Sequence, residues 1–172
     1  NKTLASAEQA GQYLTFLQQG EMFAISIVGI KEIMEYRDLT TVPLMPAFIN
    51  GVINIRGSVV PVIDLSARFH RAASKITRKS CIVIIETIND NEKMDVGIIV
   101  DCVLEVLAIA TTEIEPPPRF GTNIRAEFIS GMGKVNDKFV IILDINRVLS
   151  VEEMGDLSAT CTELPEVLNT TE

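Results

Sequence analysis

The chain has 172 residues, 47% of them hydrophobic and 22% charged, a composition that excludes a disordered protein and a large multidomain enzyme. Fifteen Lys and Arg against 23 Asp and Glu give a formal net charge of -8, which argues against nucleic-acid binding. Apolar runs are far shorter than the ~20 residues of a membrane-spanning helix, and no export signal or C-x-x-C pair is visible, so we expect a cytoplasmic protein with reduced cysteines and no direct membrane insertion.

Short β-strands dominate the predicted secondary structure. Runs rich in Val, Ile and Phe, separated by Gly, Asn and Asp turns, predict strands at residues 13–18, 22–27, 80–87, 94–100 and 138–145. Apolar residues within 145–154 are spaced closer to a helical than to a strand period, which predicts a short C-terminal helix. The predicted fold class is therefore all-β with one terminal helix.

The chain contains an internal repeat. At an offset of 80, the matching pairs are Phe48-Ile49 with Phe128-Ile129, Gly51 with Gly131, Val60 with Val140, and Asp64 with Asp144. At an offset of 73, Glu32-Ile33 matches Glu105-Val106. We assign the two copies to residues 12–69 and 80–149, joined by a basic segment at 70–79 and followed by a C-terminal helix and acidic tail at 150–172. Sheets this small usually close into barrels and need an apolar seam between them, and the sequence leaves open whether the copies exchange a strand.

Nucleophilic and phosphate-binding chemistry finds no support. His70, the one histidine, falls in the predicted join, where a surface role is expected. The run Gly131-Met132-Gly133-Lys134 lacks both the first glycine of a phosphate loop and the Ser or Thr after its lysine. We expect a turn there.

Acidic residues give no clearer catalytic or metal site. Asp64 and Asp144 occupy equivalent places after strong strands and are interpreted as helix or turn caps rather than an acid and base pair. Asp90, Glu92 and Asp95 lack the glycine and closing glutamate of a calcium loop, so a solvated hairpin is expected. No catalytic residue, metal or cofactor is predicted.

Two features leave a choice open. Arg56 has no basic counterpart in the second copy, and it either rests its stem on the barrel and points to water or pairs with a carboxylate of a partner. Residues 27–34 have apolar side chains at intervals with charges between them. Core packing is the simpler interpretation, more so for Ile33 than for Ile30, and the alternative is an apolar groove that accepts a partner helix.

One stretch resembles a known family. Gly51-Val52-Ile53-Asn54-Ile55-Arg56-Gly57 followed by Val59-Val60-Pro61-Val62-Ile63-Asp64-Leu65 resembles the G-V-x-N-x-R-G-x-x-x-P-x-x-D-L hallmark of the CheW family of bacterial chemotaxis coupling proteins. Residues 23–25, 96–101 and 114–118 add to the resemblance, which spans about 12–154. Ile55 replaces the more usual Leu, a change of branching only.

The resemblance implies two small five-stranded Src-homology-3-like β-barrels and no catalysis. It also implies a scaffold that couples the cytoplasmic tip of chemoreceptors to the regulatory domain of the histidine kinase CheA within signalling arrays. The residues expected at or beside the receptor-binding groove are Ile30, Glu32, Ile33, Gly51, Asn54, Arg56 and Val106. The kinase is expected on the second barrel, with Phe128, Ile129 and Gly131 as candidate contacts.

Two other functional assignments are compatible with parts of the sequence. The chain resembles the CheW-like module of a larger signalling protein, such as CheA or CheV, but no receiver or kinase sequence follows Leu149, which favours a free-standing adaptor if the chain is complete. A small-ligand-binding β-barrel that uses the seam as a pocket has little machinery to support it. The acidic, Thr-rich tail beyond Met154 is expected to be partly disordered.

Overall fold

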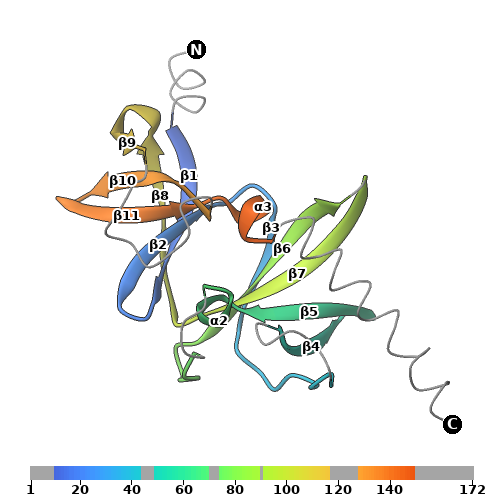
Figure 1. Cartoon of the computed structure of the whole chain (residues 1–172). Helices are drawn as coiled ribbons and strands as arrows, with labels where there is room; N and C mark the ends of the chain where they lie inside the picture. The colour runs from blue at the N-terminus through green and yellow to red at the C-terminus, as the bar shows by residue number, and fades with distance from the viewer. Residues whose placement is uncertain (1–9, 44–48, 70–73, 90, 117–127, 150–172) are drawn as a thin grey trace, which may run out of the picture.

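The computed structural model describes residues 10–43, 49–69, 74–89, 91–116 and 128–149 (Figure 1). Most of them lie in β-strands, as the alternating apolar runs predict. The strands of the first repeat are β1 (Ala10–Gln18), β2 (Glu21–Ser26), β3 (Ile30–Glu35), β4 (Ile49–Ile55) and β5 (Ser58–Asp64). Those of the second are β6 (Cys81–Asn89), β7 (Glu92–Val100), β8 (Cys102–Ala110), β9 (Ile114–Glu115), β10 (Ile129–Val135) and β11 (Lys138–Leu143).

Helices are few and short in the described residues. One turn of helix, α2 (Leu65–Arg68), follows β5, and its repeat equivalent α3 (Ile145–Val148) follows β11. A single 3-10 turn, η1 (Thr111–Glu113), precedes β9. The predicted C-terminal helix is therefore confirmed in α3, whereas His70, Asp90 and the tail 150–172 lie outside the described residues.

The strands form two sheets, and each sheet contains strands of both repeats. The six-stranded sheet has the order β8-β1-β2-β11-β10-β9, and the five-stranded sheet has the order β3-β6-β7-β5-β4. Parallel pairs join the copies, with Ile141 opposite Phe23 in one sheet and Val62 opposite Gly97 in the other. The sequence left open whether the two copies exchange a strand. Each sheet contains strands of both copies, so the boundaries 12–69 and 80–149 delimit the two repeats and do not delimit the two sheets.

One sheet has five strands, as the resemblance implied, and the other has a sixth because of β9. This two-residue strand pairs with β10, where Glu115 is opposite Met132. The five-stranded sheet has only an isolated bridge in the equivalent place, between Thr40 and Val52. Both sheets therefore have a backbone pairing at this position, and β9 makes it longer in the six-stranded sheet.

The hairpins of the two hallmark segments have the same backbone form. In the β4–β5 turn Arg56 has φ 51° and Gly57 φ 86°, and in the β10–β11 turn Asn136 has φ 50° and Asp137 φ 63°. Left-handed residues at both central positions characterise the two-residue turns whose twist matches that of the strands. The predicted turn at residues 131–134 is wrong: these residues lie within β10 and pair with β11, and the turn follows at Asn136 and Asp137.

Asp64 and Asp144 cap the two helices, as predicted. The Asp64 carboxylate accepts a hydrogen bond from the Ser66 N–H at 3.0 Å, and the Asp144 carboxylate accepts one from the Arg147 N–H at 3.3 Å. Asp64 is 1% exposed and also accepts bonds from the backbone and hydroxyl of Ser74. Both carboxylates therefore satisfy helix-start N–H groups, a structural use that competes with catalysis.

The largest hydrophobic cluster lies between the two sheets and forms the expected apolar seam. Four rings follow one another through it, with centroid distances of 5.9 Å from Phe16 to Phe23, 5.8 Å from Phe23 to Phe69, and 6.0 Å from Phe69 to Phe128. The rings come from β1, β2, the residue after α2 and the residue before β10. The seam therefore joins elements of both repeats into one core.

Candidate docking site on the edge strands

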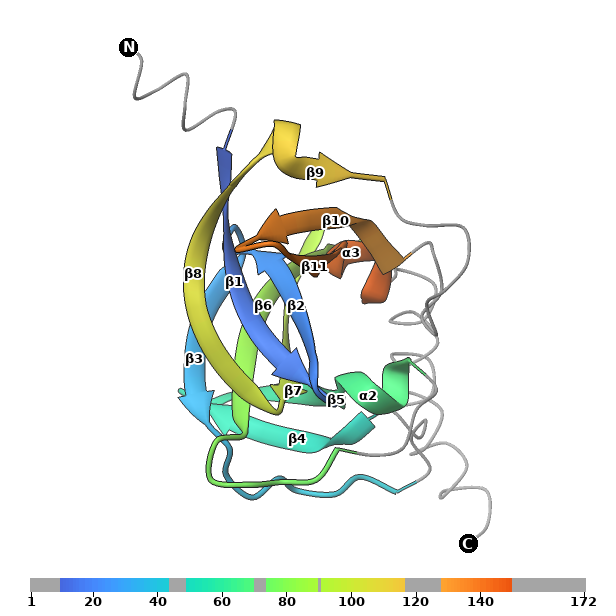
Figure 2. The same cartoon turned by 90° about the vertical axis from the view of Figure 1, so that its left-hand side faces the viewer.

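Strands β3 and β8 each lie at one edge of a sheet, and they are equivalent in the repeat. Both run between the sheets on the left of Figure 2. Each is bulged at the same place: the pairing register of β3 shifts between Ile30 and Glu32, and that of β8 shifts opposite Leu14 and Phe16. Bulges re-aim side chains and blunt a sheet edge against unwanted pairing.

The two isoleucines of β3 differ in exposure. Ile30 is half-buried and packs against the seam core, whereas Ile33 is 43% exposed. Sequence reasoning favoured the core for Ile33 more than for Ile30, and the structure reverses this order. Successive side chains of a strand point to opposite faces, so Ile33 lies on the face opposite to Met34. The spacing of the apolar residues in 27–34 does not change this alternation.

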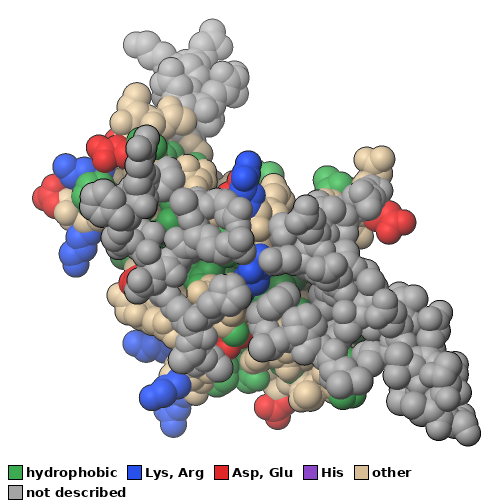
Figure 3. Space-filling view, viewed as in Figure 1, with side chains coloured by type: hydrophobic (Ala, Val, Ile, Leu, Met, Phe, Trp, Pro, Cys, Tyr) green, Lys and Arg blue, Asp and Glu red, His purple; other side chains and the backbone are tan. Residues whose placement is uncertain are grey.

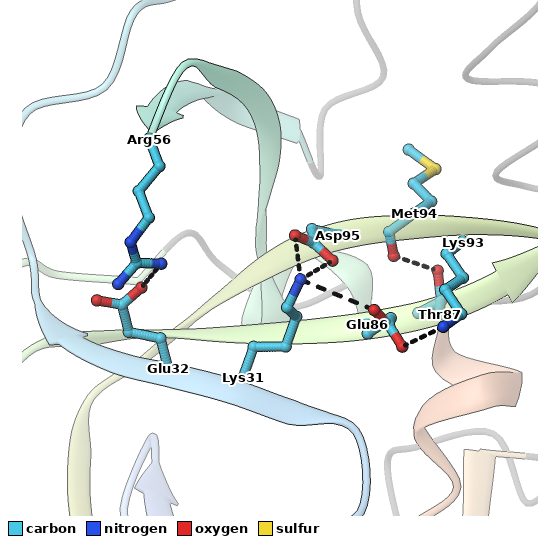
Figure 4. A network of polar contacts seen from close by, with 8 residues as sticks. All are labelled: Lys31, Glu32, Arg56, Glu86, Thr87, Lys93, Met94 and Asp95. Carbon is cyan, nitrogen blue, oxygen red and sulfur yellow. Dashed lines mark hydrogen bonds and ion pairs between the residues drawn. The ribbon is translucent and has the colours of Figure 1, made fainter.

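Arg56 pairs with a residue of its own chain (Figure 4). Its Nη1 lies 3.3 Å from Oε2 of Glu32, and its side chain is 79% exposed. The exposed guanidinium agrees with the alternative in which Arg56 points to water, and the carboxylate that it contacts belongs to the same chain. The structure thus brings together two of the predicted site residues from β3 and the β4–β5 turn.

Asn54 and Gly51 shape the hairpin that carries Arg56. The Asn54 side-chain oxygen accepts a hydrogen bond from the Gly57 N–H at 3.0 Å, which fixes the turn. Gly51 is buried, and a Cβ there would lie 2.5 Å from the carbonyl oxygen of Thr40. Asn54 is exposed beside the site, while Gly51 acts through the backbone it allows to approach.

A second ion-pair cluster lies beside this site and was missed by sequence reasoning. Nζ of Lys31 is 3.1 Å from Asp95 on β7 and 3.7 Å from Glu86 on β6. The hydrogen bond and charge of Asp95 raise the pKa of Lys31 above its usual value. Asp95 was assigned to a solvated acidic hairpin, and its cation comes from a strand 64 residues away, a pairing that local sequence does not reveal.

On β8 the structure exposes three consecutive side chains. Leu104 is 40% exposed and Val106 is 51% exposed, and Glu105 between them is exposed as well. Val106 was predicted to flank the site, and the structure places it on this exposed edge. Leu104 and Glu105 were not nominated, although the offset of 73 that equates Glu32-Ile33 with Glu105-Val106 contained the signal.

The residues predicted for kinase binding are buried. Phe128 is 2% exposed, Ile129 is 6% exposed, and Gly131 is buried against Ile114 and Glu115. Their side chains contribute to the seam and to the β9–β10 contact. They are therefore not accessible to a partner in this conformation.

The outward face of the β10–β11 hairpin, unlike these buried residues, is accessible to a partner. Phe139 on β11 is 55% exposed and lines a shallow pocket of about 230 Å³ with Glu115, Pro116 and Met132. Aromatic side chains beside apolar pockets are enriched at protein–protein interfaces. Strand alternation in residues 138–143 is the signal that separates outward Phe139 from inward Val140.

Nothing in the described residues resembles an active or metal site. No group of three or more His, Cys, Asp or Glu side chains is placed to hold a metal ion in that part of the chain. Cys81 and Cys102 are free and half-buried, and burial raises the pKa of the Cys81 thiol, which disfavours the reactive thiolate. Within the same residues no helix is long and apolar enough to cross a membrane.

The charge pattern on the visible face is also uninformative about catalysis. In Figure 3 the Lys and Arg side chains lie apart from one another and among acidic and apolar neighbours. The described residues on that face form no continuous basic surface of the kind that nucleic-acid binding requires. The candidate docking features are the exposed apolar residues and the ion pairs near these edge strands.

Comparison with known proteins agrees with this picture of a binding protein. The CheW-like domain family matches residues 12–153. Chemotaxis protein CheW of Klebsiella aerogenes is 33% identical over 151 residues, which cover 87% of this chain and 89% of that protein. Chemotaxis protein CheW of Treponema pallidum is 30% identical over 155 residues, with 90% and 91% covered. The crystal structure of the scaffolding protein TtCheW from Thermoanaerobacter tengcongensis superposes with a TM-score of 0.73 at 33% identity, covering 84% of this chain and 90% of that one.

Proposed function

Because this chain belongs to the CheW family of chemotaxis scaffold proteins, we propose that it couples chemoreceptors to the histidine kinase CheA. The scaffold holds both partners at the same time, so that the signalling state of the receptor sets the activity of the kinase. It performs no catalysis of its own and needs no cofactor. It works at the cytoplasmic tips of receptor arrays.

The receptor side of the proposal uses the exposed edge of β3. The observation that carries it is the position of Ile33, 43% exposed, next to the Glu32 and Arg56 ion pair. An amphipathic helix binds through apolar anchors, and neighbouring charges set its register. Ile33 supplies an anchor, and the ion pair supplies charges at the same edge of the sheet.

Val106 on β8 extends this surface to the second repeat. It is 51% exposed, and β3 and β8 run between the sheets on the same side of the molecule (Figure 2). A helix laid across both edge strands would touch both repeats at once. This use of equivalent strands explains why the protein needs two copies of the unit.

The kinase side of the proposal uses the outer face of the β10–β11 hairpin. Phe139 and Met132 take the place of the buried candidates Phe128 and Ile129 from the same segment. An aromatic anchor beside a shallow apolar pocket is the composition expected of a docking patch. The patch is built from β9, β10 and β11, whereas the receptor side uses β3, β8 and the β4–β5 turn, so the two surfaces share no strand and both partners can bind together.

The proposal is tested by separate titrations with a receptor cytoplasmic fragment and with the CheA regulatory domain. Independent binding of each partner, and a ternary complex when both are present, is the expected result. Mutual exclusion of the partners would contradict a coupling role. If the protein binds neither partner while circular dichroism shows an intact fold, the fold assignment remains valid and the proposed function is wrong.

A further inference from the structure

Gln18, the last residue of β1, is buried and forms hydrogen bonds with three distant segments of the chain. Its side chain is 0% exposed. Nε2 donates to the hydroxyl of Ser66 in α2 and, at 2.8 Å, to the hydroxyl of Ser74 in the segment that joins the repeats. Oε1 accepts a hydrogen bond from the Asp101 N–H at 3.1 Å. One side chain therefore contacts residues that lie 48 to 83 positions away in the sequence.

The chemistry of these partners determines how the carboxamide of Gln18 is oriented. A backbone N–H can only donate, so the atom that faces the Asp101 N–H must be the oxygen. The amide nitrogen then faces the two hydroxyl groups and uses both of its hydrogens. A half-turn of the carboxamide would place a donor against a donor. The side chain therefore fits its site in one orientation, and the three segments have defined positions around it.

The contacts of Gln18 join the two sheets. Strand β1 belongs to the six-stranded sheet, whereas α2, which contains Ser66, follows β5 of the five-stranded sheet. Asp101 is the single residue between β7 and β8, where the chain passes from the five-stranded to the six-stranded sheet. Its carboxylate also accepts a hydrogen bond from the Gln19 N–H at 2.7 Å. We call Gln18, Ser66, Ser74 and Asp101 the Gln18 junction.

Asp64 attaches the Gln18 junction to the five-stranded sheet. It is 1% exposed, and its backbone lies opposite Ile99 of β7. Its carboxylate accepts hydrogen bonds from the Ser66 N–H at 3.0 Å and from the N–H and hydroxyl of Ser74 at 2.8 and 2.7 Å. The repeat equivalent Asp144 caps α3 with a side chain that is 36% exposed, so a helix cap does not by itself require burial. The burial of Asp64 therefore serves the junction.

Hydrogen bonds at this place restrict the sheets in a way that the apolar seam does not. Apolar contacts are non-directional and tolerate small shifts of one sheet against the other. Hydrogen bonds weaken steeply with poor geometry, and a buried polar group that loses its partner is unfavourable. A shift of the sheets would break several bonds of the Gln18 junction together. Arg68 adds a further bond between the sheets, from α2 to the Val148 carbonyl oxygen in α3.

We infer that Gln18 is a positioning residue: the Gln18 junction locks the two sheets in one orientation and so sets the spacing between β3 and β8. The part that concerns the receptor rests on the proposed function. Strand β3 lies in the five-stranded sheet and β8 in the six-stranded sheet, so a partner that spans both binds best when their spacing is fixed beforehand. The kinase patch lies on β9, β10 and β11 of one sheet and does not depend on this spacing.

The lock is tested without any partner, by a distance between the sheets. Spin labels are attached at Ser58→Cys and Lys138→Cys, exposed repeat equivalents at the starts of β5 and β11. The three native cysteines are changed to serine in every sample. Pulsed electron paramagnetic resonance is expected to give a narrow distance distribution when Gln18 is present and a broader or shifted one for Gln18→Leu.

The matched control for the distance measurement is Thr87→Val. Thr87 is 6% exposed, and its hydroxyl donates to the Met94 carbonyl oxygen at 3.0 Å within the β6–β7 hairpin of a single sheet. This variant also loses a buried hydrogen bond, but it should leave the distance distribution unchanged. The comparison separates the lock from a general loss of stability.

Titrations with the two partners test what the lock does. Gln18→Leu is expected to weaken binding of a receptor cytoplasmic fragment about fivefold and to leave binding of the CheA regulatory domain within about twofold. Thr87→Val should change neither affinity. Ser66→Ala removes one partner of Gln18 from the side of the five-stranded sheet, so a smaller loss in the same direction is expected. If Gln18→Leu does not fold, Ser66→Ala provides the test.

Each outcome decides one part of the inference. An unchanged distance distribution in Gln18→Leu and Ser66→Ala, or an equal broadening in Thr87→Val, would overturn the lock and leave the proposed function standing. A broader distribution with unchanged receptor affinity would overturn the role of the lock in receptor binding. If the protein with Gln18 binds neither partner, the proposed function is wrong, and the distance measurement still decides whether the lock exists.

Discussion

Arg68 in α2 donates a hydrogen bond from Nε to the carbonyl oxygen of Val148 in α3 at 2.9 Å, and the two residues are 80 positions apart, the offset of the internal repeat. Val148 is therefore the repeat equivalent of Arg68, and the two equivalent residues contact each other. Its guanidinium also lies 4.6 Å from the ring centroid of Phe128. The two copies meet at their own equivalent positions, where a short helix of each closes the seam (Figure 1).

Arg68→Met is expected to lower the free energy of unfolding by about 2 kcal/mol, because it removes a buried hydrogen bond and the contact with the Phe128 ring. Arg68 is 3% exposed, so water does not replace these contacts. Urea denaturation measures the change. The control is Arg147→Met, since Arg147 occupies the last turn of α3 with a side chain that is 66% exposed. An equal loss of stability in both variants would contradict a special role for the contact between the helices.

Arg56→Asn is expected to weaken receptor binding about fivefold without lowering stability, because the turn retains a residue that tolerates a left-handed backbone while the ion pair with Glu32 is lost. Asn136 already occupies the equivalent turn position. Calorimetric titration with the receptor fragment gives the affinity, and thermal unfolding gives the stability. Arg56→Ala separates the two effects, since it removes the guanidinium and keeps the backbone strain. A marked loss of stability in Arg56→Asn would make the arginine structural.

Ile33→Lys and Ile30→Lys are expected to behave differently, although the residues are three positions apart. Ile33 is 43% exposed, so its replacement should abolish receptor binding, with kinase binding and stability retained. Ile30 packs against the seam core, so a lysine there should cost about 2 kcal/mol of stability and weaken both interactions. Pull-down with each partner and urea denaturation distinguish them. The assignment of Ile30 as the packed isoleucine and Ile33 as the exposed one would be wrong if Ile33→Lys were the unstable variant.

Phe139→Ser is expected to weaken binding to the CheA regulatory domain about tenfold, because it removes the aromatic anchor beside the Met132 and Pro116 pocket. Val59→Ser is the matched control: Val59 is the repeat equivalent of Phe139 and is 69% exposed on the other sheet. Receptor binding should be unchanged in both variants. Equal effects of the two substitutions on kinase binding would show that the β10–β11 face is not the specific site.

The sequence permitted accurate prediction where the information is local or repeated. The strand pattern, the caps at Asp64 and Asp144, and the CheW hallmark around Arg56 all rest on residues that are close together in the chain. The internal repeat also equated α2 with α3 and the two hairpins with each other. Each of these features depends on backbone preference or on a motif, and both can be recognised without knowing the fold.

Features that depend on pairing between distant residues could not be predicted. The pairing of Lys31 with Asp95 and the parallel pairing of β2 with β11 join residues whose sequence separation gives no hint of contact. Burial was misjudged for the same reason. Phe128 and Phe139 are both phenylalanines of the second repeat, yet one is 2% exposed and the other 55% exposed, because only the assembled sheets decide which face is covered.

The measurement that bears most directly on the proposed coupling is kinase activity in a mixture of CheA, receptor fragments arranged in arrays, and this protein. The expected result is that the receptor controls CheA activity only when the protein is present. Ile33→Lys and Phe139→Ser should each abolish this control, the first through the receptor and the second through the kinase. Receptor control that persists without the protein, or that survives both substitutions, would contradict the proposal that it couples the two partners.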